Sequence, residues 1–210
     1  MCNNHTLVNT LQRFADQAKG GHLTLGEALD SLDKAGYAFI AFILALPFMQ
    51  PIPTGPLSVV GGLAFAALGW QLLRGHESPL LPEKVRAVAL SENSWRILTG
   101  ICLKILGVCR KFTKPRQTWL VSGRQGQKIG GGILLAGGLL MAIPFGVLPF
   151  NNTLPGLAIL FYAIGELEED GVMVYISFFW LAATVVYFSA FFFALWHFGS
   201  EALNYFRWGS

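Results

Sequence analysis

Acidic residues gather between two strongly hydrophobic stretches late in the sequence. The group consists of Glu166, Glu168, Glu169 and Asp170, and Gly171 follows directly. A carboxylate inside a membrane protein is costly and usually functional, and neighbouring carboxylates raise one another's pKa towards the range of proton exchange. At a surface, the same group would be a solvated turn. Both interpretations stay open, and any proton or ion site is expected at Glu166, Glu169 and Asp170.

Polar side chains also occur in two proline-rich breaks within hydrophobic sequence. The first break is PIPTGP, and the second is GVLPFNNTLPG. Their hydroxyl and amide groups could bind a ligand in a cavity, or could satisfy backbone groups that the prolines leave unpaired. The residues expected at such a cavity are Pro51, Pro53, Thr54, Gly55, Pro149, Asn151, Asn152 and Pro155.

No residue pattern supports catalysis. The four histidines have no metal-ligand spacing, the three cysteines form neither a metal motif nor a disulfide framework, and no serine or cysteine has the partners of a known nucleophile. We therefore expect no enzymatic activity, no bound metal and no cofactor.

The composition is that of a membrane protein. Of the 210 residues, 53% are hydrophobic and only 13% are charged, whereas soluble domains carry about 25% charged residues. Eleven of the fifteen Lys and Arg residues lie between Arg74 and Lys128. The positive-inside rule assigns this basic segment, 74–128, to the cytoplasm. The fold class expected is an all-α, multi-pass integral membrane protein.

The prolines predict two re-entrant helical hairpins, over 36–73 and 129–171. The arms of the first would be roughly 21 and 25 Å long as helices, shorter than the ~30 Å hydrocarbon core. Prolines in each break force irregular backbone, which is tolerated at membrane depth only inside protein or beside a wet cavity. Residues 172–198, by contrast, form an apolar run long enough to span fully. The aromatic tail at 199–210 is typical of the membrane interface.

Amphipathic segments flank these hairpins. Within 1–35, one helix is predicted over Leu7 to Ala18, and another starts at Thr24, which has capping-box spacing to Glu27. In the basic segment, the apolar run from Ile97 to Cys109 is flanked by cations and is interpreted as interfacial. Clustered cations also favour anionic headgroups or a partner protein, and the residues expected to do so are Lys111, Lys114 and Arg116.

The two hairpins resemble each other. Ala45-Leu46-Pro47-Phe48 aligns with Ala142-Ile143-Pro144-Phe145, and the segment 63–69 aligns with 159–165 after one residue of slippage. An internal repeat is therefore predicted. Paired broken segments of this kind point to a midplane site in secondary transporters, although the prolines could instead only shape a compact fold.

Several motifs together resemble the ExoD family of bacterial exopolysaccharide-synthesis proteins. The matching segments are Leu25-Gly26-Glu27, ALPFMQPIPTGP, Trp70-Gln71-Leu72, Pro79-Leu80-Leu81-Pro82, Lys114-Pro115-Arg116, Ile143-Pro144-Phe145, Leu154-Pro155-Gly156 and Glu169-Asp170-Gly171. The resemblance implies an inner-membrane protein linked to exopolysaccharide production and to growth in alkaline conditions. Lys114 departs from it, since arginine is expected there, and so does the Asn151-Asn152 pair.

Two functions are consistent with this reading. The first is a small transporter-like protein, with a midplane site between the hairpins and a possible link to protons. The second is a non-transporting accessory protein that holds polysaccharide-synthesis enzymes or anionic lipid. Expected partners are membrane lipids, components of polysaccharide synthesis or export, and a second copy through the glycine-rich face at Gly130 to Gly138. No nucleic-acid partner is expected.

Overall fold

The structure is a computed structural model that describes residues 24–30, 32, 35–50, 55–87, 92–109, 113–144 and 148–208. The helix predicted over Leu7 to Ala18 lies outside these residues. Every regular element within them is helical. In chain order the elements are α2 (Leu25–Asp30), α3 (Ala35–Ala45), the 3-10 turn η1 (Leu46–Met49), α4 (Pro56–Leu73), α5 (Glu83–Arg86), α6 (Glu92–Cys109), the 3-10 turn η2 (Thr118–Leu120), α7 (Gly123–Ala142), α8 (Thr153–Leu167) and α9 (Gly171–Trp208).

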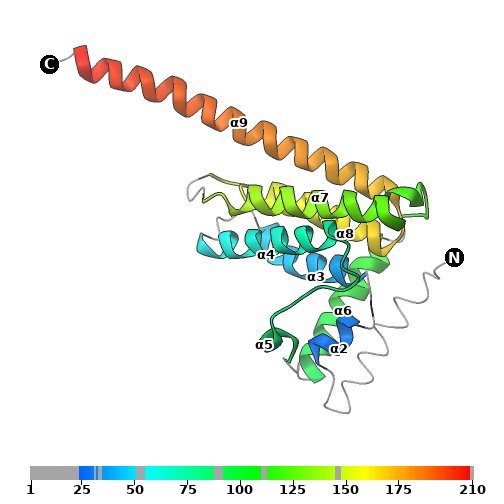
Figure 1. Cartoon of the computed structure of the whole chain (residues 1–210). Coiled ribbons are helices and arrows are strands. Elements are labelled where there is room, and N and C mark those ends of the chain that lie inside the picture. Colours follow the sequence, from blue (N-terminus) through cyan, green and yellow to red (C-terminus); the bar gives the residue numbers. More distant parts are fainter. Residues whose placement is uncertain are drawn as a thin grey trace.

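Four helices make up a bundle, and a fifth runs along it. α4 packs against α7, and α3 packs against α8. α9 packs mainly on α8 and then continues well past the bundle, whereas α2, α5 and α6 gather on the side away from α9 (Figure 1). The core at the centre is built from large buried side chains, among them Tyr37, Phe42, Phe65 and Tyr162.

Glycines let α4 and α7 approach closely. A Cβ atom on Gly62 would lie 2.6 Å from the carbonyl oxygen of Gly138, and one on Gly69 would lie 2.7 Å from that of Gly131. The two pairs are seven residues apart in each helix and run in opposite directions, as antiparallel packing requires. Small residues are how membrane helices bring their backbones together.

The rest of the glycine-rich face is also occupied within the chain. A Cβ on Gly130 would meet the ring of Tyr162, and one on Gly137 would meet Ile159, both in α8. Gly132 is different, because nothing lies within 4 Å of a Cβ built there. Gly130 and Gly137 are thus packed within the chain, whereas Gly132 is open.

Prolines set the ends of the bundle helices. Pro144 restricts Ile143 to an extended conformation, with φ −68° and ψ 121°, and α7 ends at Ala142. Pro56 opens α4, where its missing N–H costs nothing because first-turn amides have no helical partner. Pro56 and Pro144, two of the prolines predicted to break the hydrophobic arms, thus lie at or next to helix termini.

Helix boundaries differ from hydrophobic boundaries in two places. α7 begins at Gly123, before the hydrophobic run that starts at Ile129, because the polar residues RQGQK continue the helix towards the basic segment. α9 continues unbroken to Trp208, through the residues predicted to form a separate tail. Hydrophobicity marks where a helix can contact lipid, not where its hydrogen bonding stops.

Within the part of the chain that the structure describes, two helices are long and apolar enough to cross a membrane. They are α4 and the part of α9 from Gly171 to His197. α9 is 38 residues long, about 57 Å at 1.5 Å per residue. In an 18-residue apolar window of this stretch, only 11% of the residues are buried, so most of its surface faces outward.

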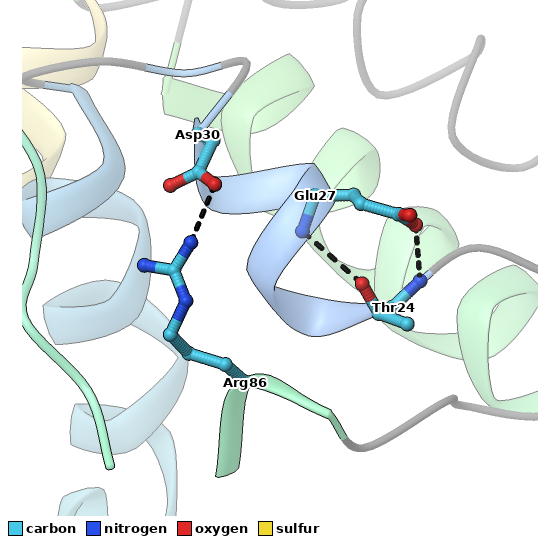
Figure 2. Close-up of polar contacts among 4 residues, drawn as sticks. All are labelled: Thr24, Glu27, Asp30 and Arg86. Atoms are coloured by element: carbon cyan, nitrogen blue, oxygen red, sulfur yellow. Dashed lines mark hydrogen bonds and ion pairs between the residues drawn. The ribbon is translucent and has the colours of Figure 1, made fainter. Parts of the chain in front are cut away.

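Outside the bundle, the predicted capping box forms at the start of α2. The Thr24 N–H donates to Oε2 of Glu27 at 2.9 Å, and the Glu27 N–H donates to Oγ1 of Thr24 at 3.2 Å (Figure 2). An ion pair between Asp30 and Arg86 then ties α2 to α5. These contacts hold the two short helices together.

α6 has one buried and one exposed side. Trp95 is fully buried in the core, whereas Ile97, Ile101 and Val108 are exposed together with Lys104. An exposed face that mixes large apolar side chains with a cation suits the membrane interface, the location predicted for this segment.

Candidate functional site

A cavity of about 450 Å³ lies where the two proline-rich breaks meet. Gly55, Pro56, Ser58, Val59 and Val60 come from the start of α4, and Pro144 and Asn151 come from the second break; together these residues line the cavity. The starts and ends of the broken helices that frame it lie at one end of the bundle (Figure 1). Segments almost a hundred residues apart are thus brought together.

The cavity exists because α7 is shorter than α4 at this end. A Cβ on Gly62 would lie 2.5 Å from the Ala142 nitrogen, so the last residue of α7 lies near the level of Gly62. α7 ends at Ala142 because of Pro144, whereas α4 extends back to Pro56. The first turn of α4 is therefore left without a helical neighbour on that side.

The cavity has a polar floor and an apolar rim. Ser58 and Asn151 are buried, with exposures of 2% and 4%, whereas Pro56, Val60 and Pro144 are exposed. The Ser58 hydroxyl donates to the carbonyl oxygen of Gly55 at 2.7 Å, so its proton is already engaged. No described lining residue carries a charge.

Hydrogen bonds fix the two breaks relative to the helices around them. The Thr153 hydroxyl at the start of α8 donates to the carbonyl oxygen of Gln50 at 2.8 Å, which joins the second break to the first. The Tyr187 hydroxyl of α9 donates to the carbonyl oxygen of Pro149 at 2.8 Å. Both bonds satisfy carbonyl groups in irregular backbone.

The residues predicted for a cavity are partly brought together. Gly55 and Asn151 line it, and Asn152 is buried beside Asn151 as the residue before α8. Pro155 is buried within the first turn of α8, and Pro149 accepts the bond from Tyr187. Pro51, Pro53 and Thr54 lie outside the described residues.

Two other predicted groups turn out to contact each other. Asp170 is fully buried, and its Oδ2 accepts a hydrogen bond from the Lys114 N–H at 3.0 Å. The Gly171 N–H donates to the Arg116 carbonyl oxygen at 2.8 Å, and a Cβ on Gly171 would lie 2.5 Å from the Gln117 oxygen. The segment from Lys114 to Gln117 is therefore docked against the Asp-Gly turn.

Asp170 also caps α9. Its Oδ1 accepts a hydrogen bond from the Val172 N–H at 3.0 Å, which is the arrangement of an N-cap aspartate. The Lys114 contact uses the backbone amide, so lysine in place of arginine at this position leaves it intact.

Glu166 belongs to a different environment from Asp170. It lies one helical turn after Tyr162 in α8, and its Oε2 atom is buried. Its charge, like the phenol of Tyr37, acts electrostatically on Tyr162. From Asn152 to Glu166, α8 rises about 21 Å at 1.5 Å per residue. The predicted proton or ion residues and the cavity thus lie at opposite ends of α8.

The predicted cationic residues are on the surface at this second end. The side chains of Lys114 and Arg116 are exposed, and Trp119 beside them is 54% exposed; Lys111 lies outside the described residues. Among the described residues, no group of three or more His, Cys, Asp or Glu side chains could hold a metal ion.

Sequence reasoning missed Pro56, Val59, Val60 and Pro144 as lining residues, and Tyr187 as the contact to the second break. A tyrosine in the middle of an apolar helix was the available signal for Tyr187, because a phenol in such a place usually finds a hydrogen-bond partner. The valines had no comparable signal, since they look like any other apolar helix residues.

Comparisons with known proteins agree on one family. The family model described as "Exopolysaccharide synthesis, ExoD" matches residues 7–190. Protein ExoD of Rhizobium meliloti (strain 1021) is 29% identical over 203 residues, which cover 96% of this chain and 83% of that protein. No solved structure matches the chain significantly.

Proposed function

We propose a function from the premise that the chain belongs to the ExoD family of exopolysaccharide-synthesis proteins, as the match over residues 7–190 shows. The protein acts in the bacterial inner membrane as a small transporter-like protein. Two re-entrant hairpins, α3–α4 and α7–α8, enter from the cytoplasmic side, and α9 spans the membrane beside them. The cavity between the two breaks is the substrate site.

The single observation that carries this proposal is the hydrogen bond between Tyr187 and Pro149. Tyr187 lies 16 positions after Gly171, which is about 24 Å from the start of α9. The second break, which Tyr187 contacts, therefore lies at this level. Apolar, exposed side chains continue beyond this level, including Phe192, Phe193 and Trp196. If the apolar part of α9 fills the hydrocarbon, the breaks lie inside it, and the hairpins stop before the far surface.

The helix pairing supports a duplicated origin for the hairpins. In the proposed repeat, α3 corresponds to α7 and α4 corresponds to α8. The α4–α7 contact then corresponds to the α8–α3 contact, and both pairs do pack together. A two-fold axis along the membrane normal relates parallel repeats in this way, and transporters with broken helices bind substrate at the repeat interface.

The orientation follows from charge. The exposed cations Lys114, Arg116, Arg124 and Lys128 lie around the start of α7, at the opposite end of the bundle from the cavity. The positive-inside rule therefore assigns this end of the bundle to the cytoplasmic side. The acidic turn that precedes α9 is then cytoplasmic as well, and the cavity lies towards the outer leaflet.

We assign any proton linkage to Glu166. Asp170 is fixed by two backbone amides as a helix cap, which favours a structural role for its charge. Glu166 is the acidic residue on α8 itself, close to the buried Tyr162. Glu166 and the cavity lie about 21 Å apart along α8. Protonation of Glu166 would therefore act on the cavity through α8, not by direct contact.

Flux in vesicles tests the proposal. Purified full-length protein is reconstituted with a trapped pH-sensitive dye, and substrate movement is followed with and without a pH gradient. We expect Glu166→Gln to remove the dependence on the gradient, while the matched change Glu169→Gln leaves it. If vesicles with the protein and vesicles without it show the same flux, the proposed transport function is wrong.

A second function is favoured by the exposed cations and Trp119 at the cytoplasmic end. As an accessory protein, the chain would hold anionic lipid or a polysaccharide-synthesis enzyme there. Replacing Lys114 and Arg116 by glutamine would then abolish exopolysaccharide production, whereas Glu166→Gln would not. The reverse pattern would favour transport.

A further inference from the structure

We propose that the cavity between the breaks takes the hydrocarbon chain of a membrane lipid, which enters sideways from the bilayer. This deepens the proposed function, on which it rests for the depth of the cavity in the membrane. A lipid, and not a free sugar or ion, would be the ligand.

The lining is the first argument. A hydrated solute that enters the cavity loses water contacts, and charged or multiply hydrogen-bonding groups must replace them. The lining residues carry no charge, the Ser58 hydroxyl already donates to Gly55, and Asn151 is the one other polar side chain among the described lining residues. The surface that remains is mainly that of Pro56, Val59, Val60 and Pro144. Such a lining suits apolar ligands, and its volume of about 450 Å³ is within the range of small-molecule sites, about 300–1,000 Å³.

The direction of the opening is the second argument. Val60 at the rim is 64% exposed, and it continues a row of exposed residues along α4, with Leu57 at 56% and Leu63 at 55%. This row is the face that α4 would turn to lipid. The mouth is thus continuous with the lipid-facing surface, and a chain can pass from bilayer to cavity without crossing a polar layer.

The floor supplies the third argument, because it distinguishes a lipid from pure hydrocarbon. Asn151 is 4% exposed and lines the cavity beneath the apolar rim. Its amide places one polar group beneath an otherwise apolar rim, where the ester or hydroxyl end of a lipid chain would lie. The proposed site therefore suits an acyl or prenyl chain close to its polar attachment.

Photolabelling tests this assignment. Full-length protein is reconstituted with phosphatidylglycerol that carries a diazirine in one acyl chain, and labelled peptides are identified by mass spectrometry. We expect labelling of residues 55–60 and 144–151 that saturates and is displaced by unlabelled lipid. Labelling that extends evenly to Leu63 and Trp70, without saturation, would mean ordinary boundary lipid and would overturn the inference.

Two tryptophan variants sharpen the result. Val59→Trp fills the cavity and should lower the saturable labelling by about tenfold, whereas Leu63→Trp, one turn away on the outward face of α4, should leave it unchanged. Thermal unfolding of each variant confirms that it is folded. If Val59→Trp does not fold, the saturation of labelling in the unaltered protein decides the question by itself.

The outcome separates the inference from the proposed function. Saturable lipid labelling without any flux would support the lipid site and contradict the proposed transport function. Flux of a water-soluble solute without saturable labelling would support the proposed transport function and contradict the lipid site.

Discussion

Gly62 of α4 and Gly138 of α7 lie backbone against backbone, each occupying the space that the other's Cβ would need. A Cβ on Gly138 would lie 2.5 Å from the Gly62 carbonyl oxygen and equally close to the Ala66 nitrogen. Because backbone cannot move aside as a side chain can, even one added methyl group must separate the two helices.

Gly138→Ala should therefore destabilise the protein. Overpacking costs about 1–3 kcal/mol, which exceeds the gain of about 1 kcal/mol from the better helix propensity of alanine. Thermal unfolding in detergent or in lipid measures the change. Gly132→Ala is the matched control in the same helix, because nothing lies within 4 Å of its Cβ, and it should be neutral or stabilising. Equal unfolding temperatures for both variants would contradict the close approach.

Asp170→Asn should loosen the segment from Lys114 to Gln117. One oxygen of asparagine can still cap Val172, but the amide nitrogen would then face the Lys114 N–H, so one buried hydrogen bond is lost at a cost of about 1–2 kcal/mol. Trypsin reports the loosening by faster cleavage after Arg116, because proline follows Lys114 and protects that bond.

The control for this change is Glu169→Gln, beside Asp170 in the same turn, since it removes a charge without removing either amide contact. Cleavage after Arg116 should stay slow in that variant. Faster cleavage in Glu169→Gln than in Asp170→Asn would mean that net charge, not the two hydrogen bonds, holds the segment.

The sequence was informative where a residue acts on its own neighbours. Pro144 restricts the residue before it, so the end of α7 could be predicted, and the capping box of Thr24 and Glu27 forms as its spacing indicates. The span predicted over 172–198 corresponds to the candidate span Gly171–His197, because hydrophobicity summed over many residues indicates it. Such effects need no knowledge of the partner helix.

The pairing of helices could not be predicted in the same way. Many apolar faces are alike in composition, and what selects α7 as the partner of α4 is the shape of a few positions. The glycines at 62 and 69 and those at 131 and 138 share a seven-residue spacing, and this was a usable signal. Asp170 was a similar case, since an aspartate directly before a helix is more often a cap than an ion site.

Glu169→Gly should stabilise the protein. Glu169 has φ +54°, in the left-handed region, which costs a residue with a Cβ about 1–2 kcal/mol. Glycine removes this cost, although part of the gain is lost to the greater freedom of the unfolded chain. Glu83→Gly, in the first turn of α5, is the control and should not stabilise. If Glu169→Gly unfolds at a higher temperature but transports less, its carboxylate has a role in function.

Tyr187→Phe should weaken the attachment of the second break to α9. The change removes the hydrogen bond to the Pro149 carbonyl oxygen while keeping the ring, and such a bond contributes about 1 kcal/mol. Hydrogen–deuterium exchange should rise in residues 151–156, which follow the break, and saturable lipid labelling of the cavity should fall. Tyr175→Phe is the matched control in the same helix, because Tyr175 is 49% exposed and lies twelve positions nearer the start of α9. If the two variants exchange alike at residues 151–156, the bond to Pro149 does not position the break, and the depth assigned to the cavity loses its support.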